Sequence, residues 1–122
     1  MRTIIIGAVF AFALIGQALG GNDLTTWSAN EIMPGCRSLI EKNTGGYEYA
    51  AGLCIGVLQA LIMTRGPEIG IFCPPDGTTR GQVLAIVVRY IDQHPQDMHE
   101  QFELLARLAL ARAWPCKTKA DK

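Results

Sequence analysis

The sequence contains few of the side chains that catalysis and metal binding require. Its only histidines are His94 and His99, which stand on either side of Pro95 and so do not share a helical face as a metal-binding pair would. Its only serines, Ser28 and Ser38, lack the Gly-x-Ser-x-Gly context of a nucleophile elbow. We therefore expect no enzymatic activity, no cofactor and no metal ion.

An excess of charge of one sign is also lacking. Eleven basic side chains balance eleven acidic ones, so the formal net charge is zero. A nucleic-acid binder that relies on basic charge needs a surplus of lysine and arginine, and we expect no nucleic-acid partner. The length of 122 residues allows one domain. No segment alternates apolar and polar residues with period two, which excludes a half-buried sheet.

The amino terminus has the pattern of a secretory signal. A positively charged start precedes an apolar run over residues 3–15, and the small residues Ala18 and Gly20 suit a signal peptidase. The alternative is a transmembrane anchor, but the run is shorter than the roughly 18–20 residues that span a bilayer. We expect a cleaved signal peptide over 1–20 and a periplasmic or secreted domain over 21–122, with no membrane span after cleavage.

The cysteines have the pattern of structural disulfides. No Cys-x-x-Cys pair is present, which excludes a zinc ribbon and a thioredoxin-type redox motif. In an oxidising compartment an even number of cysteines typically pairs within the chain. We expect two disulfides among Cys36, Cys54, Cys73 and Cys116.

Capping signals and apolar periodicity predict helices. The first is expected over residues 28–42, because Ser28 and Glu31 have the spacing of a capping box. Pro34 should kink this helix or restart it. A third helix should begin after Thr79 and end before Pro95, which disfavours helical geometry in the residue before it.

The second and fourth predicted helices are recognised by their apolar content. The second, over residues 47–64, has Gln59 as the only polar side chain of its central part, which indicates a helix buried nearly all round. Gly52 and Gly56 lie four residues apart and leave a flat stripe for a neighbouring helix. The fourth helix is expected over residues 95–113, with one apolar face.

Two helical hairpins would determine how the cysteines pair. If the first two helices are antiparallel about a turn near Gly45, one cysteine of each helix lies equally far from the turn. The last two cysteines are nearly equidistant from a turn near Pro95. The fold prediction is an all-α, small four-helix domain of two antiparallel hairpins. The predicted disulfides are Cys36–Cys54 and Cys73–Cys116.

The connection after the second helix is the candidate partner-binding segment. Binding domains without catalytic residues usually use loops held by a rigid scaffold. The segment over residues 65–72 combines both charges with apolar side chains, and a cysteine anchors its end. A shorter loop over residues 43–47 also qualifies, and the longer segment could instead be a plain linker whose isoleucines pack on the core. The predicted binding residues are Arg65, Glu68, Ile69 and Ile71.

Several segments together resemble a known family. They are Gly52-Leu-Cys-Ile-Gly56, Phe72-Cys-Pro-Pro-Asp-Gly-Thr-Thr79, Gly81-Gln82, Tyr90 to Pro95 and Ala113-Trp-Pro-Cys116. The chain resembles the Rap/Tai-type family over about residues 36–116, and the matching residues belong to the scaffold. This family contains the immunity proteins of type VI secretion amidase effectors. The resemblance implies an exported, disulfide-bonded helical protein, often a homodimer, that binds a peptidoglycan-cleaving amidase and blocks its active site.

A different class of function is also compatible with a helical bundle. An envelope ligand carrier or a stress chaperone would use the apolar interior of the four helices and would have no toxin partner. A neighbouring gene for an exported amidase would favour the immunity role. Co-purified lipid, or client binding after acid treatment, would favour the alternative.

Overall fold

The structure is a computed structural model that describes residues 27–68 and 71–117. Within these ranges the chain forms four α-helices and one short 3₁₀ helix, and no strand beyond two isolated bridges. The all-α prediction is therefore confirmed. The predicted signal peptide lies outside the described residues. The elements are α1 (Ala29–Glu41), α2 (Glu48–Met63), α3 (Arg80–Asp92), η1 (Pro95–Asp97) and α4 (Phe102–Ala113).

A capping box is present at the start of α1, as predicted, and another at the start of α3. At the start of α1, the backbone N–H and the hydroxyl of Ser28 each donate to the Glu31 carboxylate at 2.8 Å. At the start of α3, the Thr79 N–H donates to Gln82 Oε1 at 2.7 Å, and the Gln82 N–H donates to Thr79 Oγ1 at 3.3 Å. These bonds occupy donors that the first turn of a helix leaves unpaired, so each helix begins where its sequence predicts.

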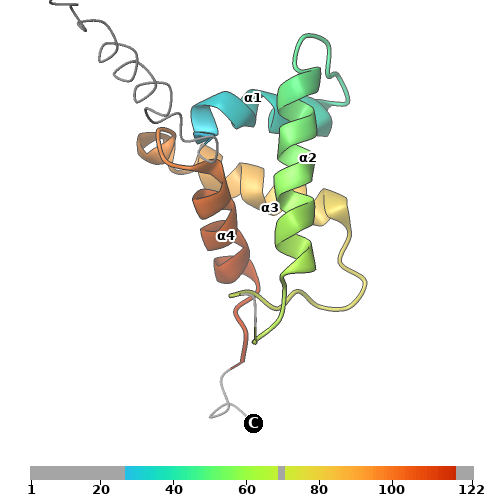
Figure 1. Cartoon of the computed structure of the whole chain (residues 1–122), viewed down its shortest axis with the longest axis vertical. Coiled ribbons are helices and arrows are strands. Elements are labelled where there is room, and N and C mark those ends of the chain that lie inside the picture. Colours follow the sequence, from blue (N-terminus) through green and yellow to red (C-terminus); the bar gives the residue numbers. More distant parts are fainter. Residues whose placement is uncertain (1–26, 69–70, 118–122) are drawn as a thin grey trace, which may run out of the picture.

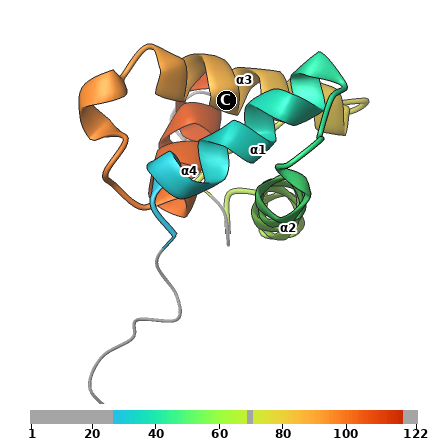
Figure 2. The same cartoon turned by 90° about the horizontal axis from the view of Figure 1, so that it is seen from above.

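The helices lie in two directions. Figures 1 and 2 show α2 and α4 running the same way along the molecule, while α1 and α3 lie across them. The most extensive contacts join α1 to α2 and α3 to α4. The antiparallel hairpin arrangement is not confirmed, because the helices of each pair cross steeply. The largest fully buried side chains at the centre are Phe72, Phe102, Ile32, Met33, Ile91 and Leu110.

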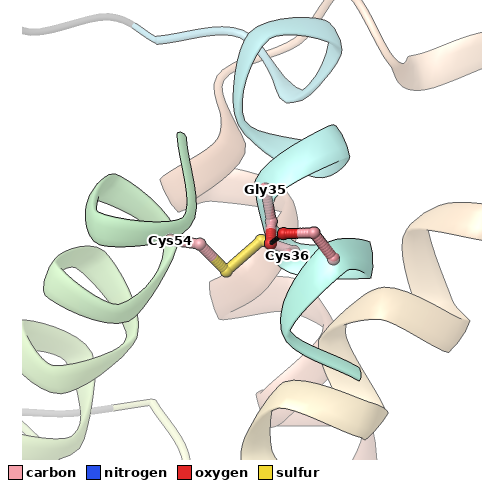
Figure 3. The surroundings of a disulfide bond; sticks show 4 residues. Gly35, Cys36 and Cys54 are labelled. Atoms are coloured by element: carbon pink, nitrogen blue, oxygen red, sulfur yellow. Dashed lines mark hydrogen bonds between the residues drawn. A yellow bond between two sulfur atoms is a disulfide. The ribbon is translucent and has the colours of Figure 1, made fainter. Parts of the chain in front are cut away.

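The predicted disulfide pairs are both present. Cys36–Cys54 joins α1 to α2 with a Cα–Cα distance of 5.5 Å. Cys73–Cys116 joins the connection between α2 and α3 to the segment that follows α4, with a Cα–Cα distance of 4.9 Å. Gly35 precedes the first bridge, at the point where α1 crosses α2 (Figure 3). A Cβ on Gly35 would lie 2.2 Å from backbone atoms of α2, so only glycine permits this close crossing.

The prediction that the second helix is buried nearly all round is wrong. Helix α2 lies at the edge of the molecule, and the exposed fractions of Tyr49, Ile55 and Met63 are 69%, 42% and 77%. Gly52 and Gly56 face open space, since a Cβ at either would meet nothing within 4 Å. The close helix–helix approach that was expected at these two glycines occurs instead at Gly35 of α1.

The predicted start of the fourth helix is also wrong. The chain forms a short 3₁₀ turn after His94, and α4 begins only at Phe102. The intervening carbonyl groups accept hydrogen bonds from the start of α1: the Ala29 N–H donates to Glu100 O, and the Asn30 N–H donates to Met98 O, both at 2.9 Å. The segment before α4 is therefore held against the start of α1, and the Phe102 N–H donates to Trp27 O at 2.9 Å and not to a carbonyl of the preceding turn.

Candidate partner-binding surface

The connection from α2 to α3, residues 64–79, is held at several points. The Gly66 N–H donates to Phe72 O at 3.1 Å, which closes a loop between them. Phe72 is 1% exposed and packs into the core. The Cys73 N–H donates to Trp114 O at 2.8 Å beside the disulfide to the end of α4. These contacts fix the described parts of the connection on either side of residues 69–70.

The predicted binding residues that the structure describes lie on the surface. Arg65 and Glu68 are exposed, and half of the Ile71 side chain is accessible to solvent. Ile69 lies outside the described residues. Ile71 therefore does not pack back on the core as a linker would require, and its neighbour Phe72 does so instead. Within the described part of the chain, Arg65 and Glu68 form no ion pair.

Two hollows adjoin this loop, and we name them by their chemistry. The loop hollow has a volume of about 120 Å³, lies beneath the connection, and carries both Arg65 and Asp76. The apolar hollow has a volume of about 200 Å³ and lies between α1, α2 and the start of α3. Ile62 borders both. The apolar hollow is lined by Leu39, Ile55, Leu58, Gln59, Ile62, Arg80, Gly81 and Leu84.

The sequence did not reveal the apolar hollow. Its walls come from three helices, and no local pattern indicates that Leu39, Leu58 and Leu84 meet around one space. The single available signal was Gln59, a polar side chain in an apolar helix. In the structure Gln59 is partly buried and forms part of the wall.

The histidines take part in surface contacts. His94 stacks on Tyr90 with ring centroids 4.2 Å apart, and its Nδ1 lies 2.6 Å from the Tyr90 carbonyl oxygen. The Arg112 guanidinium lies 5.3 Å from the centroid of the same Tyr90 ring. His99 lies beside Glu100 on the surface. In the described part of the chain, no three histidine, cysteine or acidic side chains are grouped as a metal site would require.

The cysteines indicate the cellular compartment of the protein. Two disulfides and no free cysteine among the described residues are typical of an oxidising compartment such as the periplasm or the extracellular space. None of the helices in ranges 27–68 and 71–117 is long and apolar enough to cross a membrane.

The described residues form a small helical protein that is cross-linked by two disulfides. A family model described as Rap1a immunity proteins matches residues 21–116, and the chain belongs to this family. The resemblance to the Rap/Tai-type family is thereby confirmed, and the family carries a toxin-immunity role. No curated protein and no solved structure was found to match the chain.

Proposed function

We propose that this protein is exported to the periplasm, where it binds a peptidoglycan amidase effector and blocks its active site without catalysis of its own. The observation that carries the proposal is the family match over residues 21–116. The two disulfides support export, because bridges of this kind persist in oxidising compartments. The predicted signal peptide over residues 1–20 supplies the route.

The anchored loop is the proposed contact surface. Arg65, Glu68 and Ile71 offer a cation, an anion and an exposed apolar side chain within one short segment. The disulfide of Cys73 holds the end of that segment before any partner arrives. A segment that is tethered at its end loses less conformational entropy on docking than a free one, which favours tight binding to one effector.

The alternative of a ligand carrier has less support. Sites for drug-sized ligands usually measure about 300–1,000 Å³. The apolar hollow measures about 200 Å³ and the loop hollow about 120 Å³. Spaces of this size favour side chains of a protein partner over an enclosed lipid.

We also propose that the protein is a homodimer joined through the outer face of α2. The exposed residues of this face are spaced symmetrically about Gly56, with small residues near the centre and large ones at both ends. In two copies related by a two-fold axis at Gly56, Tyr49 of each copy would lie against Met63 of the other. The residues of this α2 stripe are Tyr49, Gly52, Gly56, Ala60 and Met63.

The immunity role is tested with the oxidised mature protein and purified peptidoglycan amidase effectors, including any that is encoded beside its gene. Peptidoglycan hydrolysis should stop at an equimolar ratio, and the two proteins should elute as one complex. The double variant Arg65→Ala, Ile71→Ala should abolish inhibition and keep its thermal stability, because both side chains are exposed. Arg89→Ala, an exposed residue of α3, is the matched control and should inhibit fully.

Two outcomes would contradict the proposal. Full amidase activity in the presence of excess protein would remove the immunity role. Inhibition that falls only as far as stability falls would place the contact elsewhere. Export is tested separately by amino-terminal sequencing of periplasmic material, which should begin at Gly21. An intact Met1 in the membrane fraction would mean that the apolar run is an anchor.

A further inference from the structure

The apolar hollow is smaller than the sites of drug-sized ligands and large enough for one side chain. An engineered cavity of about 150 Å³ holds benzene, whereas sites for drug-sized molecules begin near 300 Å³. The volume of about 200 Å³ lies between these limits. Its floor consists mainly of leucine and isoleucine side chains, including Leu58 of α2 and Leu84 of α3. One leucine or phenylalanine side chain fits such a space.

The edge of the hollow carries charge of one sign. Arg80 is its only ionisable lining residue among those the structure describes, and no carboxylate faces it there. The Arg80 side chain is exposed and forms no ion pair with a described residue. It stands at the first position of α3, where the helix dipole adds to the positive potential. An anionic group beside the occupant would complement this edge.

The wall also carries a group suited to a polypeptide backbone. Gln59 is partly buried, and its amide can both donate and accept a hydrogen bond. An extended peptide offers N–H and C=O groups to such an amide, whereas the chain of a fatty acid offers none. The combination favours a peptide segment over an amphiphile.

We propose that the apolar hollow receives one large aliphatic or aromatic side chain from a protein segment that places an aspartate or glutamate next to it. The side chain fills the space between the three helices, and the carboxylate pairs with Arg80. The inference rests on the proposed function only in taking the segment to belong to the effector. The proposal adds an anchoring pocket to the contact surface. Ile62 separates this pocket from the loop hollow.

The probes are capped dipeptides of leucine and aspartate, in both orders, titrated into the oxidised mature protein at low ionic strength. Backbone amide shifts measured by NMR should change most at residues that line the hollow. Replacing aspartate by lysine in the probe should weaken binding about two- to fivefold, the range of an exposed ion pair. Replacing leucine by glycine should abolish it.

Substitution of Gly81 tests the space itself. A Cβ at this position meets only Thr79 Oγ1, at 3.8 Å, so larger residues fit the helix. Gly81→Leu should fill the hollow and weaken dipeptide binding more than about tenfold, while thermal stability is kept. Gly81→Ala is the matched control, since it improves helix propensity but adds little bulk, and it should bind like the original protein.

Reversal of the charge tests the edge. Arg80→Glu should reverse the preference, so that the lysine dipeptide binds better than the aspartate dipeptide. Arg89→Glu makes the same change in the last turn of α3 and should leave the preference unchanged. An unchanged preference in Arg80→Glu would overturn the pairing. Decanoate binding more tightly than the dipeptides, at the same residues, would overturn the peptide assignment in favour of an amphiphile site.

The amidase assay separates this inference from the immunity role. If Gly81→Leu still inhibits the amidase fully and no dipeptide binds the original protein, the anchoring pocket is wrong and the immunity role stands. If the dipeptides bind as expected and no amidase is inhibited, the pocket stands and the immunity role is wrong.

Discussion

At the residue scale, Gly35 sets the distance between α1 and α2. A Cβ built there would lie 2.2 Å from the carbonyl carbon of Ala50 and from the nitrogen of Ala51, and backbone atoms of a helix cannot move aside singly. Gly35→Ala must therefore separate the helices beside the Cys36–Cys54 bridge. We expect a loss of about 3 kcal/mol in the free energy of unfolding, measured by urea denaturation with the disulfides intact.

The matched control is Gly81→Ala on α3. Its new Cβ meets only Thr79 Oγ1, at 3.8 Å, so the variant should keep its stability or gain up to about 1 kcal/mol from helix propensity. Equal effects of the two substitutions would contradict the assignment. The sequence directed attention to Gly52 and Gly56 because of their spacing, whereas Gly35 follows a proline and belongs to no repeat. Which glycine is crowded depends on the crossing of two helices, and local sequence does not encode it.

At the scale of one element, the cap of α1 predicts a dependence on pH. The Ser28 hydroxyl, and then the Ser28 backbone N–H, lower the pKa of Glu31 below its ordinary value. A carboxyl group with a lowered folded-state pKa contributes stability above its unfolded pKa and loses it as the pH falls through the folded value. Glu31→Ala should be less stable than the original protein at about pH 7, and the deficit should shrink towards about pH 3.

Urea denaturation across this pH range measures the effect, and Glu31→Gln is the control. A glutamine can still accept a hydrogen bond from Ser28 but carries no charge. Its deficit should therefore be smaller than that of alanine at about pH 7, and it should shrink towards about pH 3, where Glu31 of the original protein is itself protonated. A Glu31→Ala deficit that stays constant with pH would mean that the carboxylate does not stabilise the helix start.

The helix boundaries show where local sequence suffices. The starts of α1 and α3 were predicted because Ser28 and Thr79 carry their partners on the same turn. The start of α4 was not predicted correctly, because the carbonyls of Met98 and Glu100 accept hydrogen bonds from the first residues of α1, which are far away in sequence. The apolar hollow was missed for the same reason, since its walls come from three helices. The exposure of Arg65 and Glu68 could be predicted from the sequence, because charged loop residues are rarely buried.

At the scale of the whole molecule, the two disulfides should differ in their response to reductant. Cys36 and Cys54 are fully buried, whereas Cys73 and Cys116 are partly exposed. Thiol exchange requires access to the sulfur, so mild reductant should open Cys73–Cys116 first. Alkylation followed by peptide mass spectrometry measures the order. Earlier labelling of Cys36 or Cys54 would contradict it.

Opening the exposed bridge should also affect the binding surface. The bridge closes a sequence separation of 43 residues, for which the loop-entropy model gives about 4 kcal/mol. Its loss releases the end of the segment that carries Arg65 and Ile71. The paired variant Cys73→Ala, Cys116→Ala should therefore bind the effector more weakly than its stability alone accounts for. Binding that merely follows the folded fraction would show that the anchor does not order the loop.

If the protein is a dimer joined through the α2 stripe, a substitution at Gly56 should change its oligomeric state without harming the fold of the single chain. Within one chain, a side chain at Gly56 meets open space, so Gly56→Leu should fold and gain helix propensity. Across a two-fold axis at Gly56 the same leucine would hold the two α2 helices apart. Light scattering after size-exclusion chromatography should give twice the chain mass for the original protein and the single chain mass for Gly56→Leu. Leu108→Ala, which removes an exposed apolar side chain from α4, should stay dimeric. A monomeric original protein, or a dimeric Gly56→Leu, would show that the α2 stripe does not join two copies.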